Sequence, residues 1–161
     1  MAFSVQVEGL DELVQSIDKL GDKALDMAAL SLYEGAGVMA DSVSQAVRGI
    51  VTEPFHYAKS GKTRKPSPEE KAIVASAKMG VAKFQKGGGD VQTSVGLKDS
   101  GYAMLKGKRK PIPQIANAIN SGTSFMQQQP FFRKAVSKAK RPATEAIERE
   151  FIKQIEKMGI E

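Results

Sequence analysis

Residues 114–136 read QIANAINSGTSFMQQQPFFRKAV, and the rest of the chain is expected to pack around this stretch. It opens with small and aliphatic residues at 115–119, a composition that suits a closely packed segment. The Gly122-Thr123 pair then breaks the segment and predicts a corner.

A new helix is predicted to start at Pro130, because the N–H that proline lacks would be unpaired at a first helical position anyway. Phe131 and Phe132 fall in its first turn. Two adjacent aromatic residues on one turn are not expected to face the same core. One of them is therefore predicted to contact another element or another chain, and ordinary core packing is the alternative.

The stretch resembles the C-terminal half of the small head–tail joining and tail-completion proteins of long-tailed bacteriophages and their prophages. The matching features are an alanine-bearing segment at 115–118, the Gly122-Thr123 turn, and a Pro-Phe-aromatic-Arg start to a long final helix at 130–133. The sequence Gly-Leu-Asp-Glu-Leu at 9–13 is also similar to the family's opening. Residues 51–110 depart most, being longer and more basic than the family's middle segment.

This resemblance implies a structural virion protein with a small antiparallel sheet packed by helices. Such a neck subunit would assemble as a ring between the capsid connector and the tail tube. Its implied partners are other copies of the same chain and the neighbouring connector and tail proteins. The chain would form a ring with its copies, or would be a monomer until assembly. It would be made in the cytoplasm of the host bacterium. The copy number, ring direction and neck layer are left open.

The composition suits one domain over residues 1–161, with a basic, loop-rich middle at about 51–113. No apolar run approaches the ~18 residues of a membrane span, and the N-terminal residues lack the pattern of a signal peptide. The absence of cysteine excludes disulfides and thiol chemistry.

Charge is distributed unevenly along the chain, whose net charge is +6. Residues 1–55 carry three basic and nine acidic side chains, residues 56–110 carry thirteen and four, and residues 111–161 carry eight and five. Such asymmetry allows the acidic part of one copy to meet the basic part of the next in a ring, or a basic loop to meet nucleic acid.

In the first third, alternation at residues 2–8 predicts a strand, and apolar spacing at 10–20 predicts a short helix that Gly21 ends. A long helix is predicted from Asp22 to Arg48 on its apolar stripe. Gly35 and Gly37 in its middle indicate either a close backbone crossing or a bend.

Residues 51–66 are predicted to form a loop, and a helix is predicted to start at the capping sequence Ser67-Pro68-Glu69-Glu70. Residues 81–85 and 91–97 predict a hairpin around the turn at 87–90, and a further strand is compatible with residues 102–105. The final helix is predicted from Pro130 to about residue 158, kinked or split by Pro142. The expected class is therefore α+β, with long N- and C-terminal helices.

No catalytic constellation is found in the sequence, so neither an enzyme activity nor a cofactor is expected. His56 is the one histidine, and with no cysteine it cannot build the usual structural zinc sites. The tripeptide Gly61-Lys62-Thr63 lacks the earlier glycine of a phosphate-binding loop.

Two functions remain, a phage neck subunit or a cytoplasmic nucleic-acid-binding module that uses the basic middle segment. For the first, the predicted partner interface comprises Phe131, Phe132, Arg133, Gly122 and Thr123. The predicted contacts with DNA or an acidic partner are Lys106, Lys108, Arg109, Lys110, Lys62, Arg64 and Lys65.

The run at 106–110 is expected to be a loop, kept out of central strands and helix interiors by Pro111 and Pro113, and a merely solvated loop is the alternative to a binding role. Few aromatic residues and no tryptophan weigh against the nucleic-acid module, because stacking platforms are then scarce.

Overall fold

The computed structural model describes residues 2–4, 22–54, 62–77, 79–81, 85–87, 90–97 and 101–157. In this part of the chain the helices are α2 (Asp22–Arg48), α3 (Pro68–Ser76), α4 (Ile112–Ser121) and α5 (Phe131–Lys157). The strands are β1 (Ala2–Ser4), β2 (Gly80–Val81), β3 (Gln85–Gly87), β4 (Asp90–Gln92), β5 (Ser94–Gly96), β6 (Tyr102–Leu105) and β7 (Lys108–Pro111). The predicted α+β class, with a long helix in each half of the chain, is confirmed. The helix predicted at 10–20 and most of the strand predicted at 2–8 lie outside the described residues.

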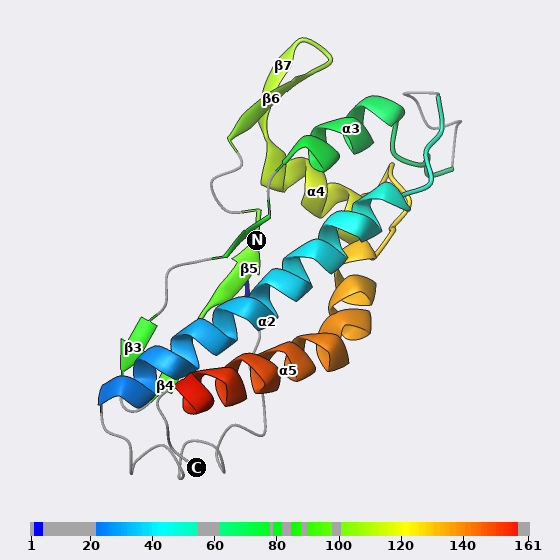
Figure 1. Cartoon of the computed structure of the whole chain (residues 1–161). Coiled ribbons are helices and arrows are strands. Elements are labelled where there is room, and N and C mark those ends of the chain that lie inside the picture. Colours follow the sequence, from blue (N-terminus) through cyan, green and yellow to red (C-terminus); the bar gives the residue numbers. More distant parts are fainter. Residues whose placement is uncertain are drawn as a thin grey trace.

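The two long helices α2 and α5 lie side by side and run in opposite directions (Figure 1). Helix α2 has the bounds that its apolar stripe predicts, and this stripe is buried, with Met39 and Val43 almost inaccessible to solvent. Ala139 and Ala143 of α5 pack in the same cluster as Met39. Small side chains on the facing surface of α5 let the two backbones approach closely.

The glycines in the middle of α2 were predicted to mark either a close backbone crossing or a bend, and the structure supports a close crossing at Gly35. A Cβ atom added there would lie 2.5 Å from Ile147 Cγ1 and 3.1 Å from the Ala143 carbonyl oxygen, both on α5. A Cβ added at Gly37 would meet nothing within 4 Å. Gly35 is therefore required by packing, whereas Gly37 is not.

This difference predicts unequal effects of alanine at the two positions. Both substitutions gain the same helix propensity, so their difference isolates the cost of overpacking, about 1–3 kcal/mol. We expect Gly35→Ala to be less stable than Gly37→Ala by that amount, as measured by urea denaturation. Equal stabilities would show that Ile147 moves aside at no cost.

The strands form three small antiparallel units. Strand β5 lies between β1 and β2, with Val95 opposite both Phe3 and Val81, and this sheet packs against α2. Strands β3 and β4 form a separate ribbon in which Gly87 lies opposite Asp90. The predicted antiparallel pairing within 81–97 is confirmed, divided into an inner ribbon (β3, β4) and an outer pair (β2, β5). The turn is narrower than predicted, because Gly87 and Asp90 are paired strand residues.

The start of α3 follows the capping sequence. The Ser67 hydroxyl accepts the Glu70 N–H at 3.2 Å, and Glu70 Oε2 accepts the Ser67 N–H at 2.8 Å. This reciprocal capping box satisfies two N–H groups that the first turn would otherwise leave unpaired.

The basic run at 106–110 is not a loop, and that prediction is wrong. Lys106 and Gly107 form a tight two-residue turn with φ values of 52° and 73°, and β7 follows at once, paired with β6 (Figure 1). Turns of this kind require positive φ at both central residues, which glycine adopts easily. Pro111 is tolerated because it ends an outer strand.

Helix α5 continues through Pro142, and Figure 1 shows it changing direction along its length. The predicted kink is thus accommodated within one helix. In its first turn, both Phe131 and Phe132 are buried in the main core cluster together with Ile119 of α4 and Val43 of α2. The expectation that the two aromatic residues could not share a core is wrong, because neighbouring positions are only about 100° apart around a helix.

Candidate functional site

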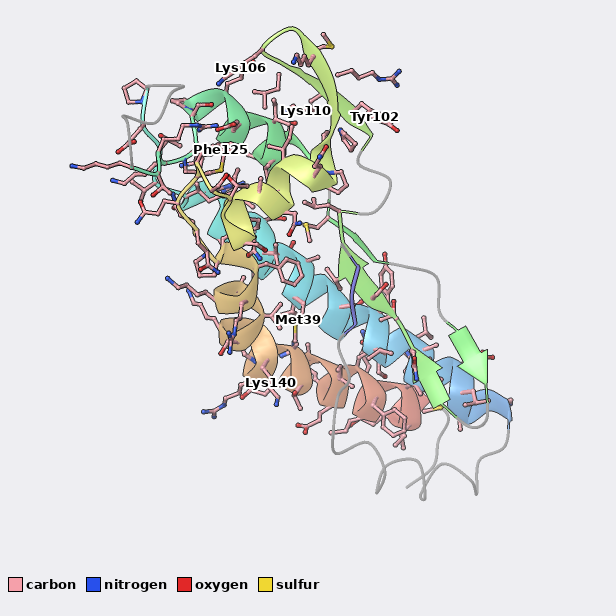
Figure 2. The ribbon with its side chains drawn as sticks, turned by 180° about the vertical axis from the view of Figure 1, so that it is seen from behind. Met39, Tyr102, Lys106, Lys110, Phe125 and Lys140 are labelled. Atoms are coloured by element: carbon pink, nitrogen blue, oxygen red, sulfur yellow. The ribbon has the colours of Figure 1, made fainter. Side chains whose placement is uncertain are left out.

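The β6–β7 hairpin is a strongly basic, exposed feature of the described chain. Figures 1 and 2 show it extending from the end of the molecule that carries α3 and α4. Its exposed cations are Lys106, Lys108, Arg109 and Lys110. Two large apolar side chains, Tyr102 and Met104, are also exposed, by 60% and 61%.

Strand pairing assigns these residues to the two faces of the hairpin. Met104 lies opposite Arg109, and Leu105 lies opposite Lys108. Opposed residues share a face and successive residues alternate. Leu105 is buried in the main core cluster, so its face is directed toward the body of the protein. The face of Tyr102, Met104 and Arg109 is directed outward.

On the outer face, Arg109 is held by a cation–π contact. Its guanidinium carbon lies 4.3 Å from the centre of the Tyr102 ring. Such a contact limits the freedom of the side chain while leaving the guanidinium N–H groups able to donate. Sequence reasoning missed Tyr102 and Met104, although their alternation with Ala103 and Leu105 was a usable signal.

Arg64, predicted to contact DNA or an acidic partner, is instead buried, and this prediction is wrong. Its side chain is 5% exposed and makes two hydrogen bonds of 2.7 Å with the two carboxylate oxygens of Glu70. Its Nη1 also donates to the Lys65 carbonyl at 3.0 Å. A buried guanidinium needs a carboxylate partner, and Glu70, six residues later at the start of α3, supplies it.

The same carboxylate is central to the electrostatics of this region. Burial by itself raises the pKa of Glu70, but hydrogen bonds from Arg64 and Ser67, together with the guanidinium charge, outweigh this effect. The pKa of Glu70 therefore lies below its ordinary value of 4.5. Glu70 is expected to stay ionised while it caps α3 and binds Arg64.

A lowered pKa in the folded state predicts a specific pH dependence. The contribution of the Glu70 charge to stability is fully present above the unfolded value near 4.5 and is lost as pH falls through the lower folded value. The difference in free energy of unfolding between wild type and Glu70→Gln should therefore be constant above the unfolded pKa near 4.5 and should shrink in more acidic solution. Urea denaturation at a series of pH values measures it, and a difference independent of pH would contradict the assignment.

The other two predicted cations of the loop have different surroundings. Lys62 is exposed. Lys65 is half-buried, its backbone N–H donates to Glu53 Oε2 at 3.1 Å, and its ammonium group lies 3.9 Å from Glu53 Oε1. Lys62 can meet a partner without rearrangement, whereas Lys65 is already placed beside a carboxylate.

The Gly122-Thr123 corner turns the chain between α4 and α5. Gly122 has a φ of 76°, and the Thr123 hydroxyl accepts the Met126 N–H at 3.0 Å. A short parallel bridge then joins this segment to the 62–66 region: the Arg64 N–H donates to the Phe125 carbonyl, and the Gln127 N–H donates to the Arg64 carbonyl. The corner thus fixes α4 and α5 relative to each other.

Three of the five predicted interface residues of this stretch are at least partly accessible, while the other two are buried. Gly122 and Thr123 are half-buried and Arg133 is exposed. Phe125, which sequence reasoning did not single out, is 54% exposed at the tip of the corner. Phe131 and Phe132 are unavailable to a partner unless the core opens.

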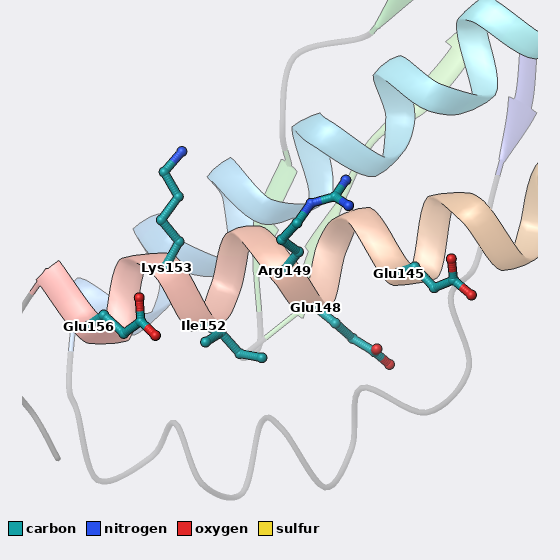
Figure 3. A pocket seen from close by; sticks show the side chains of 6 residues that line it. All are labelled: Glu145, Glu148, Arg149, Ile152, Lys153 and Glu156. Carbon is teal, nitrogen blue, oxygen red and sulfur yellow. The ribbon is translucent and has the colours of Figure 1, made fainter.

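A second surface feature is a shallow hollow of about 420 Å³ on α5. Its lining residues are Glu145, Glu148, Arg149, Ile152, Lys153 and Glu156. All belong to one helix, and in Figure 3 Arg149 and Lys153 point away from Glu145 and Glu148. The hollow does not bring its charged groups together for chemistry.

The residues that the structure describes contain neither a metal-binding cluster nor a membrane-spanning helix. Among them, no group of three or more His, Cys, Asp or Glu side chains could hold a metal ion. No helix in the same residues is both long and apolar enough to span a membrane.

Comparison with known proteins gives no relative: no family model, no curated protein and no solved structure matches the chain.

Proposed function

We propose that this chain is a structural virion protein of a long-tailed bacteriophage or prophage, a head–tail joining or tail-completion subunit. It would assemble as a ring between the capsid connector and the tail tube and catalyse no reaction. The observation that carries the proposal is the order of α4, the Gly122-Thr123 corner, the start at residues 130–133 and the long helix α5. This is the order on which the sequence resemblance rests.

Assembly would use exposed residues rather than the buried phenylalanines. Phe125 and Arg133 lie close in sequence to the corner and are exposed, so they replace Phe131 and Phe132 as the proposed anchors of a subunit boundary. Gly122 and Thr123 would set the geometry of that boundary. In a head-to-tail ring, each copy presents one surface to one neighbour and a different surface to the other. The acidic 1–55 segment and the basic 56–110 segment supply complementary charges for such contacts.

The proposal is tested by deleting the gene in the phage or prophage that encodes it. We expect electron micrographs to show complete heads and complete tails that are not joined, and expression of the wild-type chain in the host to restore joined particles. Joined, infectious particles in the deletion strain would refute the proposal.

A second function, a nucleic-acid-binding module outside the virion, is favoured by the exposed cations and Tyr102 of the β6–β7 hairpin. The same deletion separates the two functions. A regulatory or nucleic-acid-binding role predicts changed gene expression or replication with joined particles, whereas the neck role predicts unjoined heads and tails with normal amounts of each.

A further inference from the structure

Strand β7 of the β6–β7 hairpin carries positive charge on both of its faces. Helix α3 contacts β6, whereas β7 pairs with β6 and continues directly into α4. Lys108 and Lys110 lie on the face of β7 that Leu105 shares, and Arg109 lies on the opposite face. All three are exposed.

These three cations are available for a ligand. Within the described part of the chain, no carboxylate forms an ion pair with Lys108, Arg109 or Lys110. Tyr102 holds the Arg109 side chain from one side, so part of the entropy of ordering that side chain is lost before a ligand binds.

The backbone of β7 adds a donor at the same edge. In a hairpin with a two-residue turn, the pair next to the turn, Leu105 and Lys108, exchanges hydrogen bonds, and the next pair, Met104 and Arg109, does not. The Arg109 N–H is therefore directed away from β6, toward the open edge. A ligand along this edge would meet a backbone N–H flanked by three cationic side chains.

We propose that β7 binds the phosphate backbone of double-stranded DNA without reading its base sequence. Phosphate oxygens accept hydrogen bonds from lysine, arginine and backbone N–H groups, all of which this edge presents. A flat acidic protein surface could meet only one of the two charged faces. A DNA groove is bordered by two phosphate backbones, so an edge that enters it can use the cations of both faces, and the major groove is wide enough for a two-stranded ribbon.

This inference deepens the proposed function and rests on it only for the source of the DNA, which would be the genome passing through the neck. Contacts to about three phosphates give each chain only weak DNA binding, which does not depend on the base sequence. Weak contacts suit DNA that must move past the protein, and a ring would multiply them without making any single contact tight.

The test measures binding of the purified full chain to a fluorescein-labelled DNA duplex of random sequence, by anisotropy at several salt concentrations. The test variant is Lys108→Ala/Arg109→Ala/Lys110→Ala. A matched control, Lys134→Ala/Lys138→Ala/Arg141→Ala, removes the same residue types from an exposed part of α5. Circular dichroism and thermal unfolding establish that each variant is folded.

We expect the hairpin variant to bind at least about tenfold more weakly at low salt. Its plot of log K against log salt concentration should be shallower by about 2.7, since each phosphate contact contributes about 0.9. The α5 control should keep the wild-type slope. Equal losses in the two variants would show that only net charge matters and would overturn the inference.

Two further outcomes also decide the matter. Poly-L-glutamate, matched in charge to the duplex, should compete poorly; competition equal to that of unlabelled duplex would identify an acidic-protein surface instead and overturn the DNA assignment. Tyr102→Ala should weaken duplex binding less than the triple substitution, because it loosens Arg109 but removes no charge.

Failure of this inference is distinguishable from failure of the neck role. Hairpin variants with unchanged DNA binding, in a phage whose deletion mutant makes unjoined particles, would refute the DNA contact alone. Joined particles in the deletion mutant would refute the neck role, whatever the binding assay gives.

Discussion

Glu70→Gln is expected to lower the free energy of unfolding by about 3–5 kcal/mol, although Glu70 lies on a short surface helix. Both side chains of its ion pair with Arg64 are 5% exposed, and two hydrogen bonds of 2.7 Å join them. Glutamine keeps the shape of the side chain and can still cap α3. It removes the negative charge, however, and leaves the Arg64 guanidinium buried without a counter-ion.

The measurement is chemical denaturation of the isolated chain, with Glu69→Gln as its control. Glu69 is exposed in the same helical turn, so its loss should cost less than about 1 kcal/mol through the helix dipole alone. Arg64→Met/Glu70→Gln should recover most of the loss, because no buried charge then remains. A Glu70→Gln protein as stable as the Glu69→Gln protein would contradict the buried pair.

The cause of so large an effect is the position of Arg64 between distant segments. Its backbone N–H and carbonyl are hydrogen-bonded to Phe125 and Gln127, which follow the Gly122-Thr123 corner. Its side chain binds Glu70 at the start of α3. Loss of the pair would therefore loosen the contact between the 62–66 region and the corner as well as the α3 cap. Amide hydrogen exchange of Gln127, whose N–H donates to the Arg64 carbonyl, should speed up in Glu70→Gln.

Phe132→Ala is the second substitution with a large expected effect, about 3–5 kcal/mol of lost stability. Phe132 is 6% exposed in the main core cluster, and its backbone N–H donates to Asn120 Oδ1 at 3.1 Å, a bond that alanine retains. The loss thus reports the cavity left by the ring. Phe131→Ala should behave similarly, since Phe131 is 7% exposed in the same cluster.

Phe125→Ala provides the contrast. Phe125 is 54% exposed, so its removal should change stability by less than about 0.5 kcal/mol. Denaturation midpoints independent of protein concentration would show that the core belongs to a single chain. If Phe131→Ala and Phe132→Ala left those midpoints unchanged and reduced only self-association, the two residues would be interface anchors after all.

The candidate site was predictable in part, and the hairpin shows where prediction stopped. Its cations stand together in the sequence, so their concentration at one exposed feature was expected. The strand at 108–111 was not expected, because two prolines suggested a loop. An outer strand tolerates proline, and whether a strand is outer or central depends on its neighbours, which a single segment does not reveal.

Elements whose signals are local follow from the sequence alone. Helix α2 has the bounds that its apolar stripe predicts, and α3 starts at Ser67 because the capping partner Glu70 is only three residues away. Tertiary structure alone decided that Arg64 is buried and that Phe131 and Phe132 share one core. The phenylalanines pack in one cluster with residues of α2, and the Arg64 backbone is hydrogen-bonded to residues 125 and 127. These segments are dozens of residues away in the chain, and a local pattern carries no information about which distant segment it will meet.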